Sequence, residues 1–177
     1  VGVVRAAGET GVPTALVISA GFGEADDRGR ELEADLRETA REAGIRVVGP
    51  NCIGVASGRT GTVLTPTCSR RPEPGRVGLA SQSGALAFTT FYERGADEDL
   101  EFAYVASTGN EADLSVTDHV AYMAADDDVD VVCAYVEGVD DPRRFVETAR
   151  AATRAGTPTL VTKIGRSEVG HVRDPLS

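Results

Sequence analysis

The stretch Gly78-Leu-Ala-Ser-Gln-Ser-Gly-Ala-Leu86 decides the fold, because it predicts a strand that turns into a helix through a short Ser/Gly loop. The apolar run over 77–80 suits a buried strand, and the apolar spacing after Gly84 is typical of a helix. Ser83 and Gly84 then fall at the helix N-terminus, where free backbone N–H groups favour an anion. The turn therefore predicts a phosphate site, to which the hydroxyl groups of Ser81 and Ser83 would add donors. The alternative is that Ser83 only caps the helix.

Short β-branched runs alternate with helical patterns along most of the chain, which is the signature of an α/β fold with a parallel sheet. The expected strands cover residues 14–20, 45–48, 76–81, 101–106, 129–136 and 158–164, and the expected helices cover residues 1–9, 29–43, 84–95, 114–125 and 142–155. The segment 57–75 is rich in Gly, Thr, Pro and Arg, which is typical of a linker. The unit before it opens on a helix with no strand in front. We therefore expect the chain to be a fragment of a longer protein.

Composition excludes several classes of partner. The 177 residues carry a net charge of -10, which argues against nucleic acid and anionic membranes. No stretch has the length of a membrane span and no secretory signal is present, so we expect a cytoplasmic protein. Cys52, Cys68 and Cys133 lack CxxC spacing, which predicts free thiols and no metal site. The acidity fits either adaptation to high salt or an Arg-favouring genome, and the composition leaves both open.

Polar and Gly-rich segments follow several of the expected strands. They cover residues 18–23, 49–54, 107–111 and 137–141. Ligands of doubly wound sheets gather at the carboxyl ends of strands, so these segments are candidate binding loops. Each segment alone is weak evidence, since strand-to-helix loops also need Gly and Asn for their turn geometry.

Taken together and in order, six segments resemble one family. They are Val17-Ile-Ser-Ala-Gly-Phe22, Gly49-Pro-Asn-Cys-Ile-Gly54, Ser81-Gln-Ser-Gly-Ala-Leu86, Gly109-Asn-Glu-Ala-Asp113, Tyr135-Val-Glu-Gly138 and Lys163-Ile-Gly-Arg-Ser-Glu-Val-Gly170. The family is that of the ADP-forming (NDP-forming) acyl-CoA synthetases, relatives of the succinyl-CoA synthetase alpha subunit. The resemblance implies that residues 1–70 are the C-terminal half of a Rossmann-like CoA-binding domain. Residues 71–75 would be a linker, and residues 76–177 a flavodoxin-like ligase domain with a parallel sheet.

The resemblance also implies a reaction. Acyl-CoA, ADP and phosphate would be interconverted with acid, CoA and ATP through an acyl phosphate and a phosphorylated histidine. CoA, phosphate and a small carboxylic acid would be the ligands of this chain. ADP or ATP and Mg would be bound by an ATP-grasp domain or a beta subunit outside it, and the whole would be an oligomer.

Roles for individual residues follow from the same resemblance. The phosphoryl cradle would consist of Ser81, Ser83 and Gly84, the CoA site of Ile18, Ser19 and Ala20, and the surroundings of the CoA thiol of Asn51 and Cys52. Glu137 would hydrogen-bond the nucleophilic His and fix its tautomer. Phe88 matches the helix position that contacts the acyl substrate. The alternatives are a solvated strand-end carboxylate for Glu137 and a small buried residue for Cys52.

The sequence departs from the family pattern at two points. It lacks the Gly-rich phosphate loop that opens the CoA domain, and it lacks the nucleophilic His, which is expected at or just after Ser177. His171 lies too early for that role, and His119 is expected to be structural. The isolated chain is therefore expected to be inactive.

Two other classes remain open. One is a non-catalytic CoA-sensing region of a protein acetyltransferase. The other is a Ser hydrolase, although the turn lacks the Gly-x-Ser-x-Gly pattern of a nucleophile elbow.

Overall fold

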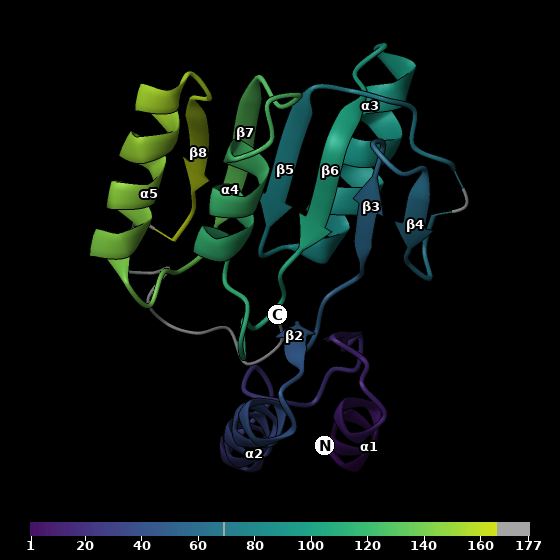
Figure 1. The fold of residues 1–177 in the computed structure, drawn as a ribbon, viewed down its shortest axis with the longest axis vertical. Coiled ribbons are helices and arrows are strands. Elements are labelled where there is room, and N and C mark those ends of the chain that lie inside the picture. The colour runs from purple at the N-terminus through teal and green to yellow at the C-terminus, as the bar shows by residue number, and fades with distance from the viewer. Residues whose placement is uncertain (69, 166–177) are drawn as a thin grey trace.

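The computed structural model describes residues 1–68 and 70–165, which form two sheets joined by their loops (Figure 1). The smaller sheet contains β1 (Thr14–Leu16) and β2 (Arg46–Val48), which run parallel. Helices α1 (Gly2–Glu9) and α2 (Asp27–Ala43) flank it. Both helices and both strands fall where the sequence predicts them, although the first strand ends four residues early.

The larger sheet contains six strands in the order β4-β3-β6-β5-β7-β8. These are β3 (Val55–Ser57), β4 (Thr62–Leu64), β5 (Val77–Ser81), β6 (Phe102–Ser107), β7 (Val131–Val136) and β8 (Thr159–Lys163). The last four are mutually parallel, whereas β3 pairs antiparallel with both β4 and β6. Helices α4 (Val116–Ala124) and α5 (Pro142–Ala155) lie on one face, while the π-helix η1 (Leu86–Tyr92) and α3 (Glu93–Asp97) lie on the other (Figure 1). The expected α/β class with a mostly parallel sheet is confirmed.

A hydrophobic core fills each side of the larger sheet. Phe88 and Tyr92 of η1 are fully buried against Val105 on one side, and Val120 and Met123 of α4 are buried against Val132 on the other. Each such side chain contributes about 1.5–3 kcal/mol of transfer free energy. The smaller unit has its own core around Leu36, Ile45 and Val47. The two helical layers are therefore fixed on the sheet independently of the smaller unit.

Helix ends follow the signals in the sequence. Asp141 caps α5 by accepting from the backbone N–H of Arg144 at 2.9 Å, and Pro142 occupies the first helical position. Gly156 ends this helix in the left-handed conformation with φ of 106°. Ser115 and Asp118 form a reciprocal capping box at the start of α4. The loops that precede α4 and α5 are thereby held in fixed positions.

The segment expected to be a linker, residues 57–75, is partly a β-hairpin. Strand β4 and the last residue of β3 lie within it, and Ala56 pairs with Val105 of the larger sheet. The Gly-rich stretch that suggested a linker is in part the hairpin turn over 58–61, between two three-residue strands too short to give an alternating pattern. The prediction of a linker is therefore wrong for residues 57–64.

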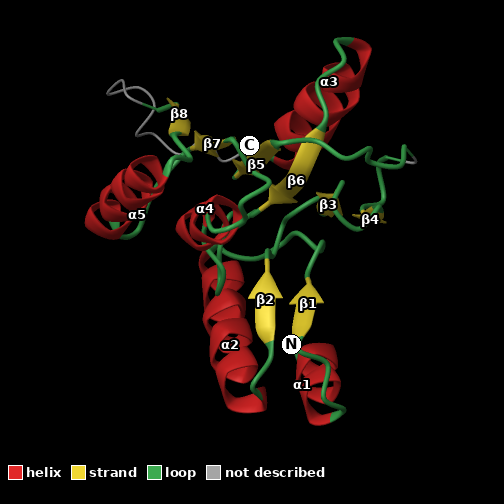
Figure 2. Ribbon diagram, turned by 45° about the horizontal axis from the view of Figure 1, so that its top comes forward, coloured by secondary structure: helices red, strands yellow, loops and turns green. Residues whose placement is uncertain are grey.

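The carboxyl ends of the parallel strands in the two sheets face each other (Figure 2). The loop after β6 continues along β2, because the N–H groups of Asn110, Ala112 and Leu114 donate to carbonyl groups of residues 47–50 at 2.9–3.1 Å. Gly109 requires its left-handed φ of 59° here, and a Cβ atom would lie 2.1 Å from the carbonyl oxygen of Pro50. The loops that carry the candidate site residues therefore meet at one seam.

Candidate functional site

The Ser/Gly turn leads from β5 into a helix that is continuous from Gly84 to Asp97. Ser81 is fully buried, and its hydroxyl donates to the Ser83 carbonyl oxygen at 2.7 Å. The Ser83 hydroxyl accepts weakly from Leu86 N at 3.4 Å, as an N-cap does. Within residues 1–68 and 70–165, the N–H groups of Ser83, Gly84 and Ala85 have no hydrogen-bond acceptor. The turn thus offers backbone donors at a helix N-terminus, the arrangement that suits a phosphate or a carboxylate.

Two residues of the turn, Ser81 and Gly84, make structural contacts that the sequence did not predict. The Ser81 hydroxyl closes the turn from the inside, so its proton points to a carbonyl group and not to the crevice. Gly84 packs against the segment that connects β2 to β3, because a Cβ atom there would lie 2.5 Å from Cγ1 of Ile53. The Ser81 hydroxyl is consequently not an open donor of the turn, whereas the backbone N–H groups and the Ser83 hydroxyl, which accepts from Leu86 N, can still donate.

Glu137 lies at the same edge of the sheet as this turn. It follows β7, which pairs directly with β5 and places Tyr135 opposite Ser81. Its side chain is exposed. The side-chain amide of Gln82 links the two loops by accepting from Glu137 N at 2.6 Å. The structure therefore brings Ser83 and Glu137 to neighbouring positions on one edge, where a single ligand could contact both.

The three expected CoA-site residues, Ile18, Ser19 and Ala20, are exposed directly after β1. Asn51 is also exposed, and its side chain donates to Asn110 Oδ1 at 3.2 Å. Cys52 is only 1% exposed, and its thiol donates to Val17 O at 3.3 Å. Burial raises the pKa of this thiol to about 11, so it is protonated near neutral pH. Its placement matches the alternative of a small buried residue.

Phe88 lies in the core and does not line the crevice. Its ring is fully buried and meets Tyr92 edge to face at a centroid distance of 5.8 Å. In this conformation its contacts are those of a packing residue, and its contact with an acyl group stays a prediction. The apolar spacing of the helix marks Phe88 as a core position as readily as a substrate contact.

The sequence assigns no role to individual residues of the segment Gly109-Asn-Glu-Ala-Asp113. The structure shows which contacts Asn110 and Glu111 make. Asn110 Nδ2 donates to Glu33 Oε2 at 2.8 Å and to Glu24, both of which belong to the smaller unit. Glu111 adopts a left-handed φ of 62°, and its Oε1 accepts from Thr108 Oγ1 at 2.8 Å and from Val116 N at 2.9 Å. Burial raises the pKa of Glu111, although these hydrogen bonds oppose the shift. In the sequence, the only signal for these contacts of Glu111 was an acidic residue that follows Gly and Asn in a turn.

His119, the histidine among residues 1–68 and 70–165, does not form a hydrolase site with the turn. His119 Nδ1 bonds the backbone oxygen of Ser115 at 2.9 Å, and burial lowers the pKa of the imidazole. Ser83 is hydrogen-bonded to the helix backbone instead of a base. His119 is thus placed as a structural residue, whereas His171 and Ser177 lie outside the described residues.

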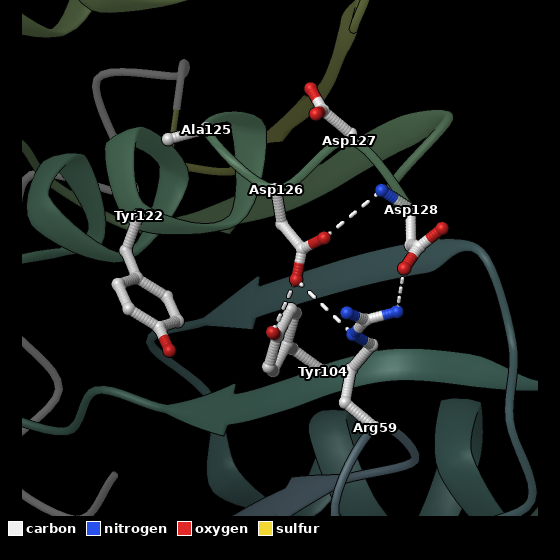
Figure 3. A pocket seen from close by; sticks show the side chains of 7 residues that line it. All are labelled: Arg59, Tyr104, Tyr122, Ala125, Asp126, Asp127 and Asp128. Atoms are coloured by element: carbon white, nitrogen blue, oxygen red, sulfur yellow. Dashed lines mark hydrogen bonds and ion pairs between the residues drawn. The ribbon is translucent and has the colours of Figure 1, made fainter.

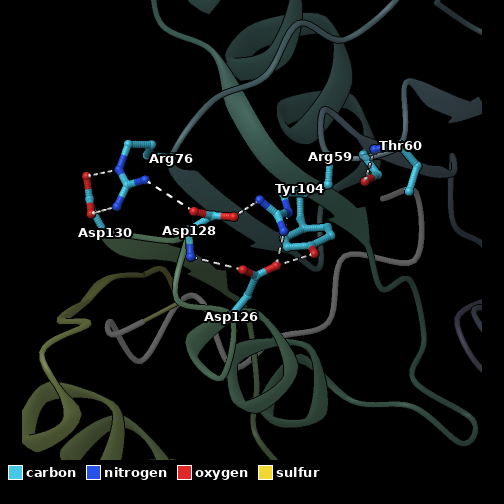
Figure 4. A network of polar contacts seen from close by, with 8 residues as sticks. Arg59, Thr60, Arg76, Tyr104, Asp126, Asp128 and Asp130 are labelled. Atoms are coloured by element: carbon cyan, nitrogen blue, oxygen red, sulfur yellow. Dashed lines mark hydrogen bonds and ion pairs between the residues drawn. The ribbon is translucent and has the colours of Figure 1, made fainter.

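A cavity of about 320 Å³ opens beside this edge, lined by residues of the loops after β6 and β7, of the first turns of α4 and α5, and by Arg37 of α2. Glu111 is among its lining residues. A larger hollow, of about 490 Å³, lies at the opposite end of the sheet (Figure 3). There Arg59 bridges Asp126 and Asp128, and Tyr104 donates to Asp126 at 2.5 Å. This network continues through Arg76 (Figure 4) and contains none of the predicted site residues.

Among residues 1–68 and 70–165, no helix is long and apolar enough to cross a membrane. The same residues contain no group of three or more His, Cys, Asp or Glu side chains that could hold a metal ion.

The mostly parallel sheet, the N–H-lined turn after β5 and the carboxylate after β7 define an α/β domain whose candidate site lies at the strand ends. Residues 74–173 match the family described as succinyl-CoA ligase like flavodoxin domain, and the chain belongs to this family. It is 40% identical over 94% of its length to acetate–CoA ligase (ADP-forming) I of Archaeoglobus fulgidus, and spans 24% of that protein. It is 38% identical over 92% of its length to the alpha subunit of acetate–CoA ligase (ADP-forming) II of Pyrococcus furiosus, and spans 35% of it.

Solved structures agree with these sequence matches. The chain superposes with a TM-score of 0.86 on the dinucleotide forming acetyl-coenzyme A synthetase 1 of Ca. Korarchaeum cryptofilum in complex with phosphate and ADP. The identity is 33%, and the match covers 96% of this chain and 36% of that one. The expected relation to ADP-forming acyl-CoA synthetases is confirmed, and the chain spans about a quarter to a third of these relatives.

Proposed function

We propose that the chain is the CoA-binding and phosphoryl-transfer part of an ADP-forming acyl-CoA synthetase. The reaction would interconvert acyl-CoA, ADP and phosphate with acid, CoA and ATP through an acyl phosphate and a phosphohistidine. The observation that carries this proposal is the shared edge of the Ser83 turn and Glu137, held together by Gln82. The curated relatives that act as ADP-forming acetate–CoA ligases support it.

In this proposal the turn receives the phosphoryl group. The N–H groups of Ser83 and Gly84 donate to its oxygens, and the helix dipole favours its negative charge. Ser81 contributes by closing the turn, since its hydroxyl is bonded to Ser83 O. Glu137 accepts a hydrogen bond from the imidazole of the nucleophilic His. This contact fixes the tautomer and stabilises the cation that forms when the imidazole nitrogen takes the phosphoryl group from the acyl phosphate. The P–O bond to the acyl oxygen breaks, and a carboxylate leaves.

The smaller unit binds CoA in this proposal, as part of a Rossmann-like domain. Exposed residues after β1, namely Ile18, Ser19 and Ala20, would contact the cofactor, and Asn51 would lie toward its thiol end. Cys52 would support the loop from beneath. ADP or ATP and Mg would be held by an ATP-grasp domain or a beta subunit. The three free cysteines suit a reducing, cytoplasmic location.

The proposal is tested by phosphohistidine formation in the complete protein. Incubation with ATP labelled at the γ-phosphate should give an acid-labile, alkali-stable phosphoprotein. Glu137→Gln should lower the rate of its formation by about 10² or more, because an acid–base group that orients the nucleophile contributes on that order. Glu147→Gln, which changes an exposed residue of α5, is the matched control and should leave the rate unchanged. A complete protein that forms no phosphohistidine would refute the proposed function.

A further inference from the structure

Gln82 occupies the space between the two loops on which the proposed function depends. Its Oε1 accepts from Glu137 N at 2.6 Å and from Gly138 N at 2.9 Å, and its Nε2 donates to Gly138 O at 2.7 Å. Its own backbone N–H donates to Tyr135 O at 3.1 Å. We propose that Gln82 is a positioning residue that sets Glu137 against the phosphate turn, an inference that rests on the proposed function.

The loop that carries Glu137 has few other supports. Glu137 and Gly138 are both exposed, and a Cβ atom at Gly138 would meet nothing within 4 Å. Among the described residues, one further side chain holds this backbone, since Lys163 Nζ donates to Glu137 O at 2.8 Å. The peptide groups on either side of the Glu137 Cα atom are thus held by Gln82 and Lys163, which restricts where its carboxylate can point.

The chemistry of the clamp requires an amide. Two backbone N–H groups and one carbonyl group must be satisfied at once, and a carboxamide does so without charge because it presents an acceptor and a donor on separate atoms. A cation could not accept from Glu137 N. A carboxylate at position 82 would lose the donor for Gly138 O and would add negative charge beside Glu137 and the buried Glu111. An Asn would fall short by one methylene group.

Hydrogen exchange in the complete protein tests the clamp directly. Gln82→Met keeps the length of the side chain and removes all three hydrogen bonds. We expect the amides of Glu137 and Gly138 to exchange at least 10-fold faster in this variant, with the amides of β7 unchanged. Gln82→Glu keeps the acceptor and should retain most of the protection of these two amides. This variant is used if Gln82→Met does not fold. Unchanged exchange at both amides in Gln82→Met would overturn the proposal.

A double-mutant cycle tests whether the clamp acts through Glu137. Gln82→Met should lower the rate of phosphohistidine formation at least 10-fold in the otherwise unchanged protein. In a Glu137→Gln background it should lower the rate less than 2-fold, because the carboxylate that it positions is already absent. Equal effects in both backgrounds would refute the positioning role. A protein that forms no phosphohistidine at all refutes the proposed function instead, and the exchange measurement then decides whether Gln82 holds the loop.

Discussion

Replacing Asn110 with Asp should loosen the seam between the two units. Asn110 belongs to the loop after β6, and its Nδ2 donates to Glu24 and Glu33 of the smaller unit. Its Oδ1 accepts from Asn51 Nδ2 at 3.2 Å. Asn110→Asp turns the shared donor into an acceptor and places a third carboxylate against two others.

The size of the effect follows from these contacts. Hydrogen bonds to charged groups contribute about 1.5–3 kcal/mol each, and we take about 1 kcal/mol for each of these two because the side chain is half-exposed. Like charges about 4 Å apart repel by about 1 kcal/mol in water and by about 4 kcal/mol near a protein surface, and the lower figure suits this open site. Asn110→Asp should therefore lower the free energy of unfolding by about 4 kcal/mol, and Asn110→Ala by about 2 kcal/mol.

Denaturant unfolding at two pH values separates the two contributions. The Asp variant should be less stable than the Ala variant at pH 7, and the difference should disappear near pH 3, where carboxyl groups take up protons. Adding Glu33→Gln to Asn110→Asp should recover part of the loss at pH 7, because it removes one repulsive partner. Equal stability of the Asp and Ala variants at pH 7 would refute this account of the seam.

Two further predictions concern buried side chains. Burial raises the pKa of Glu111 above 4.5, so the folded protein binds this proton more tightly than the unfolded chain, and the ionised group costs stability as pH rises. Glu111→Gln keeps the acceptor for Val116 N. In urea unfolding, this variant should be more stable than the unchanged chain at pH 7 but not at pH 4. An equal gain in stability at both pH values would contradict a raised pKa of Glu111. Phe88→Ala should lower the free energy of unfolding by about 3–5 kcal/mol. Phe88→Leu should keep the fold and leave the relative rates with different acids unchanged, whereas a changed preference in that assay would place the ring at the substrate.

The sequence predicted most helices and strands because their signals are local. The N-cap Asp141, the first-turn Pro142 and the closing Gly156 fix α5 without reference to the rest of the chain. The β3–β4 hairpin was missed because strands of three residues carry too little pattern, and their pairing with β6 depends on contacts about 50 residues apart. Long-range pairing of this kind has no local signal in the sequence.

The candidate site was predictable in its loops but not in its side-chain directions. Strand-to-helix turns at Ser83 and after β7 fall at one edge whenever the sheet is parallel, so their proximity follows from topology. The burial of Ser81 and Phe88 does not follow, because it depends on which helix face meets the sheet. For the same reason the sequence did not show that Gly84 leaves space for the side chain of Ile53.

The two amide side chains at the seam, Gln82 and Asn110, suit a site that must accept an anion within an acidic protein. With a net charge of -10, additional carboxylates around the turn would repel phosphate, and Lys163 is the only lysine of the chain. Asn110 binds carboxylates of the smaller unit by donating to them, and Gln82 binds backbone groups at no cost in charge. Both hold loops in place while leaving the N–H groups of the turn, which have no acceptor among residues 1–68 and 70–165, as a local source of positive potential. A charged residue in either position would lose hydrogen bonds that hold the loops and would also change the field that the phosphoryl group meets.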